Sequence, residues 1–218
     1  MHGYFALEKG LTEPKNVIHD HEMKALASNI DYEVPTWNQI YEMLLYQAQK
    51  IKTQNYKPDL IVAIARGGVV PARILSDLLE TPNLSFMQIE FYTSINQTLQ
   101  EPILKQTLTT NVTGKKILLI DDISDTGKSL QLAKNHLQHQ GAIEIRTATL
   151  YGKPHSVTTP DFYEKQTTDW VVFPWDIKET LRKIVHNPLG KRILNQELAK
   201  LVKAGLPKQL SEKLIKDL

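Results

Sequence analysis

Two adjacent carboxylates, Asp121 and Asp122, stand directly after a run of apolar residues and before a short polar turn. A pair of carboxylates at the end of a strand can accept hydrogen bonds from a vicinal diol, or can hold Mg²⁺ partly through water. The pair therefore indicates a site for a sugar, a metal ion or both.

The turn that follows, residues 125–129, has the residue types of a phosphate site. Successive backbone N–H groups at a helix N-terminus point at one spot, and the helix dipole there favours an anion. Thr126 and Ser129 add hydroxyl donors, and Gly127 lets the backbone approach a ligand closely. A turn suited to phosphate, a few residues away from two carboxylates suited to a diol, predicts a site for a ribose 5-phosphate.

Strands and helices must bring these residues together, and the chain alternates between the two. The patterns predict strands over 60–65, 84–92, 116–121, 143–151 and 169–173, helices over 37–52, 71–79 and 127–138, and helical sequence after 176. The central strands are continuous apolar runs, which is typical of a parallel sheet covered on both faces. Ligands bind at the carboxyl ends of the strands in such sheets. The predicted fold class is therefore α/β, with the candidate site at that edge.

Residues 117–130, which read Ile-Leu-Leu-Ile-Asp-Asp-Ile-Ser-Asp-Thr-Gly-Lys-Ser-Leu, resemble the phosphoribosyl-pyrophosphate (PRPP) signature of the type I phosphoribosyltransferases. The most similar members are the bacterial and archaeal 6-oxopurine enzymes. The resemblance implies a central, mainly parallel sheet flanked by helices, a flexible loop at 93–114 and a helical C-terminal extension. It also implies that a nitrogenous base displaces pyrophosphate from PRPP, with Mg²⁺ as the cofactor.

The resemblance assigns the PRPP side of the site. The two acids would contact the ribose hydroxyls and the metal, and the loop after the first core strand would bind pyrophosphate. Arg66 in that loop would stabilise the leaving diphosphate, on which charge grows in the transition state. The PRPP-binding residues implied in this way are Asp121, Asp122, Asp125, Thr126, Gly127, Lys128, Ser129, Arg66 and Gly67.

The resemblance also assigns the base side. In the 6-oxopurine enzymes, the acid before the Thr-Gly pair lies near the purine N7 and is the proposed proton-transfer group. The corresponding residue here is Asp125, so Asp125 and Arg66 are the catalytic candidates. Lys153, which precedes a proline, would donate to the purine O6. Trp170 would stack on the base and the backbone at Val171 would read its edge. Asp176 aligns near an acid associated with the metal or with pyrophosphate, which adds it to the first two acids as a metal candidate. The nearby Trp175 is expected to pack in the core.

Composition excludes several classes of protein. The 218 residues include no cysteine and carry a formal net charge of +2. The absence of cysteine rules out disulfides, Cys-ligated zinc, iron–sulfur clusters and thiol nucleophiles. The apolar runs are too short to span a membrane, and the start of the sequence lacks a secretory signal pattern. A cytoplasmic location without membrane contact is expected.

Three parts of the chain are expected: an N-terminal extension at 1–33, a phosphoribosyltransferase domain at 34–177 and a basic helical extension at 178–218. The last part holds ten Lys or Arg residues against four acids, which gives a net charge of +6. It contains no aromatic residue on which single-stranded nucleic acid could stack, and its apolar residues recur at helical spacing. We therefore expect it to pack rather than to bind nucleic acid.

Two functions stay open. The first is a purine-salvage enzyme whose partners are PRPP and a purine base, assembled as a dimer or tetramer as the family resemblance implies. The second is a regulator that keeps the fold as a PRPP sensor and binds nucleic acid through its basic segment. Intact Arg66, Asp125 and Lys153 favour the enzyme, because a sensor needs only affinity for PRPP. The sequence does not rank guanine, xanthine and hypoxanthine as substrates.

Overall fold

The computed structural model of the chain describes residues 31–92, 101–186 and 191–218. Its helices are α2 (Trp37–Thr53), α3 (Val69–Leu78), α4 (Lys128–His139), α5 (Ile177–Val185), α6 (Lys191–Lys203) and α7 (Lys208–Ile215). Its strands are β1 (Tyr32–Glu33), β2 (Leu60–Ala65), β3 (Leu84–Tyr92), β4 (Glu101–Gln106), β5 (Lys116–Ile120), β6 (Ile123–Ser124), β7 (Glu144–Ala148), β8 (Tyr151–Gly152), β9 (Lys165–Gln166) and β10 (Trp170–Val171). Residues 1–30 of the expected N-terminal extension and residues 93–100 of the expected flexible loop lie outside the described residues.

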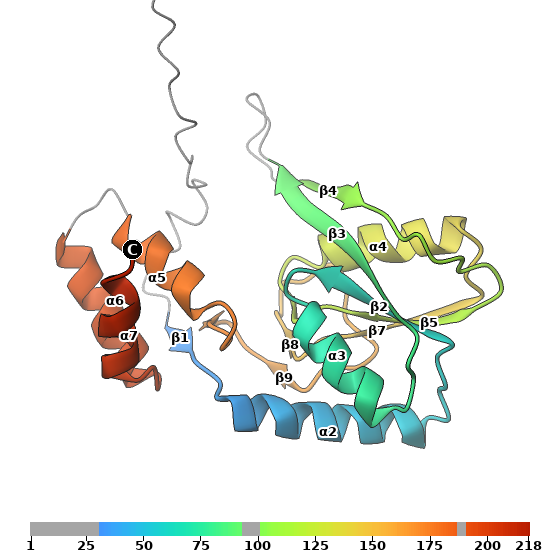
Figure 1. Cartoon of the computed structure of the whole chain (residues 1–218), viewed down its shortest axis with the longest axis horizontal. Helices are drawn as coiled ribbons and strands as arrows, with labels where there is room; N and C mark the ends of the chain where they lie inside the picture. Colours follow the sequence, from blue (N-terminus) through green and yellow to red (C-terminus); the bar gives the residue numbers. More distant parts are fainter. Residues whose placement is uncertain (1–30, 93–100, 187–190) are drawn as a thin grey trace, which may run out of the picture.

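A five-stranded sheet in the order β4-β3-β2-β5-β7 forms the centre of the molecule (Figure 1). The strands from β3 to β7 run parallel, and β4 pairs antiparallel with β3 at one edge. Ala63 of β2 lies beside Ile120 of β5, which lies beside Ala148 of β7. The carboxyl ends of these three strands are therefore neighbours, and the expected mainly parallel α/β sheet is confirmed.

Helices cover both faces of this sheet (Figure 1). On one face, Ile40 and Leu44 of α2 and Leu75 of α3 pack against alternate residues of β2 and β5. On the other face, Leu130 and Leu137 of α4 pack against the intervening residues of the same strands. Because both faces of β2 and β5 are covered, these two strands carry no polar residue after Lys116 at the start of β5, and the candidate site residues follow their carboxyl ends.

A smaller parallel sheet in the order β6-β8-β9 continues the chain beyond the central sheet. It begins where Thr149 leaves the β7 ladder and donates its backbone N–H to the carbonyl oxygen of Phe162, 2.9 Å away. Gln47, buried in α2, donates its side-chain amide to the carbonyl oxygen of Thr149 over 2.7 Å. These bonds explain why the strand expected over 143–151 is two separate strands.

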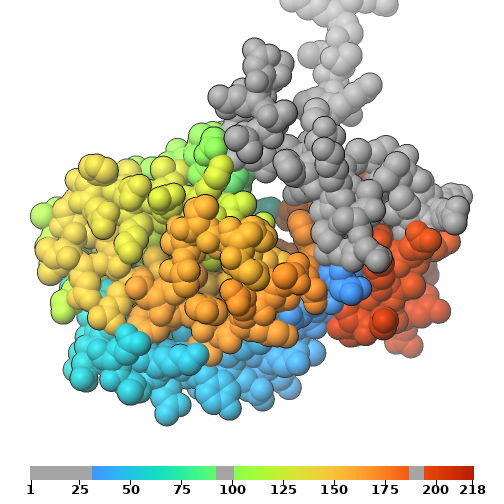
Figure 2. Space-filling view, turned by 180° about the vertical axis from the view of Figure 1, so that it is seen from behind, coloured from blue at the N-terminus to red at the C-terminus, as the bar shows by residue number. Residues whose placement is uncertain are grey.

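The last three helices pack around a separate hydrophobic core, here called the C-terminal core. Its buried members are Val172, Leu181, Ile184, Leu201 and Leu206, and its partly buried members include Tyr32, Val34, Trp170, Leu194, Leu198 and Leu218. Figure 1 shows α5, α6 and α7 grouped beside β1, and Figure 2 shows the red C-terminal segment of α6 and α7 beside the blue start of the described chain. The expected helical extension is confirmed, and it packs through its apolar residues.

The structure departs from the predicted elements at β10 and at β4. The strand expected over 169–173 is only β10, and it pairs in parallel with β1 instead of joining the central sheet. The pairing joins residues that the expected boundary at 33/34 would assign to different parts of the chain, and the C-terminal core joins residues from both sides of the expected boundary at 177/178; both boundaries stay predictions. The residues of β4 belonged to the expected loop, because an edge strand with exposed side chains shows no apolar pattern.

None of the helices in the described ranges has the length and apolar character required to cross a membrane.

Candidate active site

The loop after β2 and the start of the segment after β5 are packed without space between them. The backbone N–H of Gly68 donates to the carbonyl oxygen of Ile64 over 2.9 Å, which turns the chain back toward the sheet. A Cβ atom on Gly68 would lie 2.3 Å from the carbonyl oxygen of Ile120. A Cβ atom on Gly67 would lie 2.3 Å from Oδ2 of Asp122. Both positions therefore require glycine, and the loop touches the acid pair directly. The peptide bond between Ala65 and Arg66 at the start of this loop is cis.

The acid pair is held in a place that disfavours two charges. Asp122 is 8% exposed, and Oδ1 of Asp121 accepts a hydrogen bond from the backbone N–H of Asp122 over 3.0 Å. Burial, followed by the neighbouring charge of Asp122, raises the pKa of Asp121 well above its ordinary value. Burial, followed by the charge of Asp176, raises the pKa of Asp122 to about 6. Such a cluster of carboxylates favours an added cation or a hydroxyl donor, both of which lower its charge repulsion.

Trp175 and Asp176 lie beside this pair. The indole Nε1 of Trp175 donates to Oδ2 of Asp122 over 3.4 Å, and its ring stacks on Phe173 with centroids 4.8 Å apart and planes 6° from parallel. The expected packing of Trp175 is confirmed, with this added polar contact. Burial and the nearby Glu179 raise the pKa of Asp176. The three acids expected to hold a metal are thus electrostatically linked, although no three His, Asp or Glu side chains in the described ranges converge closely enough to coordinate an ion by themselves.

Arg66 has a partner that sequence reasoning missed. Its Nη2 lies 2.7 Å from Oε2 of Glu179, near the start of α5. Burial acts to raise the pKa of Glu179, but the cations of Lys183 and Arg66 outweigh it and the pKa is lowered. The sequence offered a signal, because Glu179 lies three residues after the candidate Asp176 at a helix start and so shares its helix face.

The expected phosphate turn leads into α4 through a left-handed glycine. Gly127 is the N-cap of α4 with φ +77°, and it has no side chain with which to cap the first N–H groups of the helix. A Cβ atom there would lie 2.4 Å from Oγ of Ser156 and 2.6 Å from the backbone nitrogen of Thr158. The backbone N–H of Val157 donates to the carbonyl oxygen of Thr126 over 2.9 Å. The segment after β8 therefore braces the turn from outside.

Lys128 and Ser129 begin α4 within the same turn. The ammonium of Lys128 lies 2.6 Å from Oε1 of Glu101, the first residue of β4. The side chain thus reaches from the phosphate turn to the edge of the sheet. Its role toward a phosphate stays a prediction.

The expected base-recognition residues come from three segments. Asp125 is 60% exposed, and its Oδ1 lies 3.4 Å from Nε2 of His155. Lys153 donates from its ammonium to the carbonyl oxygen of Asp169, and burial lowers its pKa against the opposing charge of Asp125. The charge of Asp125 therefore acts on Lys153, and the roles of both residues toward a base stay predictions.

β10 presents Trp170 and Val171 differently. Trp170 is half-buried, and part of it packs against the C-terminal core. The backbone N–H of Trp170 donates to the carbonyl oxygen of Asp31, just before β1, over 2.9 Å, and that of Val172 donates to the carbonyl oxygen of Glu33 in β1 over 2.8 Å. Since N–H groups alternate in direction along a strand, the N–H of Val171 points away from β1. That direction suits the edge-reading role expected for it, which stays a prediction.

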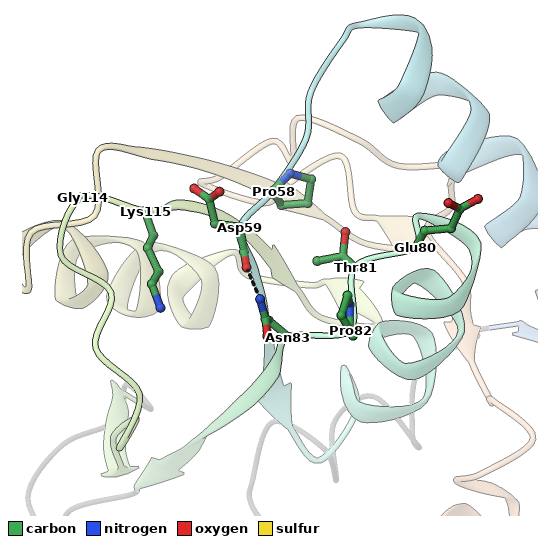
Figure 3. A pocket seen from close by; sticks show the side chains of 8 residues that line it. All are labelled: Pro58, Asp59, Glu80, Thr81, Pro82, Asn83, Gly114 and Lys115. Carbon is green, nitrogen blue, oxygen red and sulfur yellow. Dashed lines mark hydrogen bonds between the residues drawn. The ribbon is translucent and has the colours of Figure 1, made fainter.

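One hollow is remote from all of these residues. Its volume is about 440 Å³, and it is lined by Pro58, Asp59, Glu80, Thr81, Pro82, Asn83, Gly114 and Lys115 (Figure 3). Asp59, Asn83 and Lys115 directly precede β2, β3 and β5, so the hollow lies at the amino ends of the strands. The side-chain amide of Asn83 spans it to the carbonyl oxygen of Asp59, 3.1 Å away. The expected site residues instead follow the carboxyl ends of the strands.

Comparison with known proteins finds a family model, curated relatives and solved structures that this chain resembles. Residues 37–180 match the family model described as a phosphoribosyl transferase domain. A xanthine-guanine phosphoribosyltransferase from Nitratidesulfovibrio vulgaris is 35% identical over 118 residues, which are 53% of this chain and 68% of that protein. The crystal structure of a purine phosphoribosyltransferase from Pyrococcus horikoshii Ot3 has a TM-score of 0.61 and 34% identity, over 67% of this chain and 94% of that one.

A further structural neighbour covers more of the chain. It is a hypothetical protein from Neisseria gonorrhoeae solved with bound ppGpp, and it is 19% identical with a TM-score of 0.64 over 87% of this chain and 98% of that one. At that identity the likeness concerns the fold alone. It extends over more of the chain than the family match does.

Proposed function

Because the chain belongs to the phosphoribosyltransferase family, we propose that it transfers the 5-phosphoribosyl group of PRPP to guanine, xanthine or hypoxanthine. The products are a nucleoside monophosphate and pyrophosphate, and the role is purine salvage. Membership already makes the chain a phosphoribosyltransferase of the type I fold. The observation that carries the finer proposal is the contact of Gly67 with Asp122, which joins an Arg-Gly loop to an acid pair beside the N-terminus of α4.

On the PRPP side, three segments of the chain each bind a different part of the ligand. The turn from Asp125 to Ser129 receives the 5′-phosphate on the first N–H groups of α4, where the helix dipole favours an anion. Asp121 and Asp122 accept hydrogen bonds from the ribose hydroxyls. The loop with Arg66 and Gly67 receives the diphosphate. Arg66 stabilises the charge that develops on the diphosphate as the bond to the ribose breaks.

The base side uses Lys153, Asp125 and β10. One N–H of the Lys153 ammonium is held by the carbonyl oxygen of Asp169, and the other two remain to donate to the purine O6. Asp125 exchanges the proton at N7. Trp170 offers the accessible part of its ring for stacking, and the outward N–H of Val171 reads the base edge. Adenine fits this arrangement poorly, because its 6-amino group would face the donor Lys153.

Mg²⁺ is the cofactor we propose for this site. Burial and the charge of the neighbouring Asp176 raise the pKa of Asp122, which indicates a place suited to a cation. Asp121, Asp122 and Asp176 would hold the ion together with ligand oxygens and water, since Mg²⁺ commonly keeps part of its hydration shell and binds through one or two carboxylates. When bound, the ion neutralises charge on the diphosphate.

The experiment that tests the proposal measures initial rates of pyrophosphate release. PRPP and Mg²⁺ are combined with hypoxanthine, guanine, xanthine or adenine in turn. We expect turnover with one or more oxopurines and little with adenine. Binding of PRPP without turnover of any base would contradict the salvage role and would favour a PRPP sensor. A cytoplasmic location and assembly as a dimer or tetramer stay predictions, and light scattering of the purified protein checks the second.

A substitution at Asp125 tests the proton-transfer role. We expect Asp125→Asn to lower kcat about 100- to 1,000-fold, because general acid–base catalysis contributes on that order. The KM for PRPP should change little if the turn keeps its backbone geometry. His155→Gln is the matched control, since it removes the partner 3.4 Å from Asp125 but leaves the carboxylate in place. An unchanged kcat in Asp125→Asn would contradict the assignment.

A further inference from the structure

Helix α5 presents a row of charged residues on one face. Asp176, Glu179 and Lys183 are spaced by three and then four residues, so they lie above one another on the helix surface. Leu181 and Ile184 are buried in the C-terminal core. The helix is therefore anchored on one side, and its charged row has a fixed position relative to the strand ends.

The middle residue of this row, Glu179, contacts the loop after β2. Its Oε2 lies 2.7 Å from Nη2 of Arg66, and its Oε1 lies 3.5 Å from the ammonium of Lys183. The Arg66 side chain is 80% exposed. An exposed arginine without a partner samples many rotamers and loses that freedom when it binds a ligand. Glu179 instead gives the Arg66 side chain one preferred direction.

The contact leaves Arg66 able to bind an anion. A guanidinium carries five N–H donors, and Glu179 occupies only Nη2 within hydrogen-bonding distance. The neighbouring Gly67 is fixed against Asp122, so the backbone of Arg66 is also held. Arg66 is thus held at both ends: its backbone lies beside the acid pair, and its guanidinium contacts Glu179 in the C-terminal segment.

We propose that Glu179 is a positioning residue for the diphosphate of PRPP, acting through Arg66. This inference rests on the proposed function, because it assigns the diphosphate to Arg66. It gives the helical C-terminal segment a part in the site: a carboxylate from α5 orders the cation that meets the leaving group. Glu179 itself does not touch the ligand. It reduces the conformational entropy that the Arg66 side chain loses when the diphosphate binds.

The test is a double-mutant cycle on diphosphate binding. Calorimetry measures the Kd of inorganic diphosphate with Mg²⁺ for the full-length protein, Glu179→Gln, Arg66→Met and the double variant. We expect Glu179→Gln to raise the Kd about two- to fivefold, the range measured for exposed ion pairs. The same substitution should have no effect once Arg66 is replaced. Glu212→Gln on α7 is the matched control, because Glu212 has an i,i+4 lysine partner but lies on another helix.

Several results would overturn the proposal. A Kd that is unchanged or lowered in Glu179→Gln would mean that Glu179 does not order Arg66 for the ligand, or that it competes with the ligand. An equal loss in the Arg66→Met background would mean that Glu179 acts through general charge or folding, and absence of diphosphate binding to the unmodified protein would also overturn it. In steady-state assays the KM for PRPP should rise while kcat stays within about twofold. Absence of turnover with an intact binding cycle would contradict the proposed function but leave this inference standing.

Discussion

At the scale of single residues, we propose that Asp122 binds the ligand, and its buried charge lowers the free energy of unfolding at neutral pH. Its folded-state pKa of about 6 lies above its ordinary value. The folded protein therefore keeps a proton on this group at pH values where the unfolded chain has lost it. The stability that this proton contributes is fully present below the ordinary pKa of aspartate, and it is lost as the pH rises through about 6.

This linkage predicts the effect of Asp122→Asn. At pH 7 without Mg²⁺, the variant should gain about 1–3 kcal/mol in free energy of unfolding, because a pKa shift of one unit corresponds to about 1.4 kcal/mol. The gain should shrink toward pH 4. Urea titrations at both pH values check it, with Asp77→Asn at an exposed position of α3 as the control. A loss of stability at pH 7 would contradict the prediction, while PRPP turnover should fall in any case.

Gly67 is the second residue whose replacement has a defined outcome. A Cβ atom at this position would lie 2.3 Å from the Asp122 carboxylate, so Gly67→Ala must displace either the loop or the acid. We expect the Kd for PRPP to rise at least about tenfold, which is about 1.4 kcal/mol. In the control Gly152→Ala the nearest atom is 3.8 Å away, an ordinary contact. Equal PRPP affinity in the two variants would contradict the expected role of the loop.

At the scale of elements, the sequence predicted the helices and strands that depend mainly on residues close together in the chain. The helix predicted over 37–52 is α2, which begins after a capping box of Thr36 and Gln39, and the apolar runs of β2 and β5 are strands. The strand predicted over 169–173 is the shorter β10, and its pairing was not predicted, because its partner β1 comes from a distant part of the sequence. The contact between Arg66 and Glu179 was missed for the same reason, since no local pattern joins a loop to a helix that far along the chain.

The turn into α4 gives an element-scale prediction. Gly127→Ala places a side chain at φ +77° and against Ser156, so the turn should rearrange. We expect a loss of about 1–3 kcal/mol in stability and a marked rise in the KM for PRPP. Gly141→Ala is the matched control, because Gly141 also has a positive φ but lies after the far end of α4. If both variants lose stability but only Gly127→Ala loses PRPP affinity, the phosphate role is supported; equal KM values would contradict it.

At the scale of the whole molecule, the C-terminal core connects the helical segment to Trp170, which we propose for the base side of the site. Leu201 is fully buried there, and Trp170 packs against the same core. Leu201→Ala should cost about 2–5 kcal/mol in stability, as is usual for a buried leucine. The KM for the purine should rise more than the KM for PRPP. The neighbouring Val202→Ala, 38% exposed, is the control and should change the melting temperature little.

The composition of this core also determines the order in which the molecule matures during translation. It needs Tyr32 together with residues as late as Leu218. A ribosome releases the central sheet and the phosphate turn well before it releases α6 and α7. In that interval the nascent chain already holds the acid pair and the Arg-Gly loop, but the support behind Trp170 is incomplete. The proposed purine side is thus the last part of the site to form on a newly made chain.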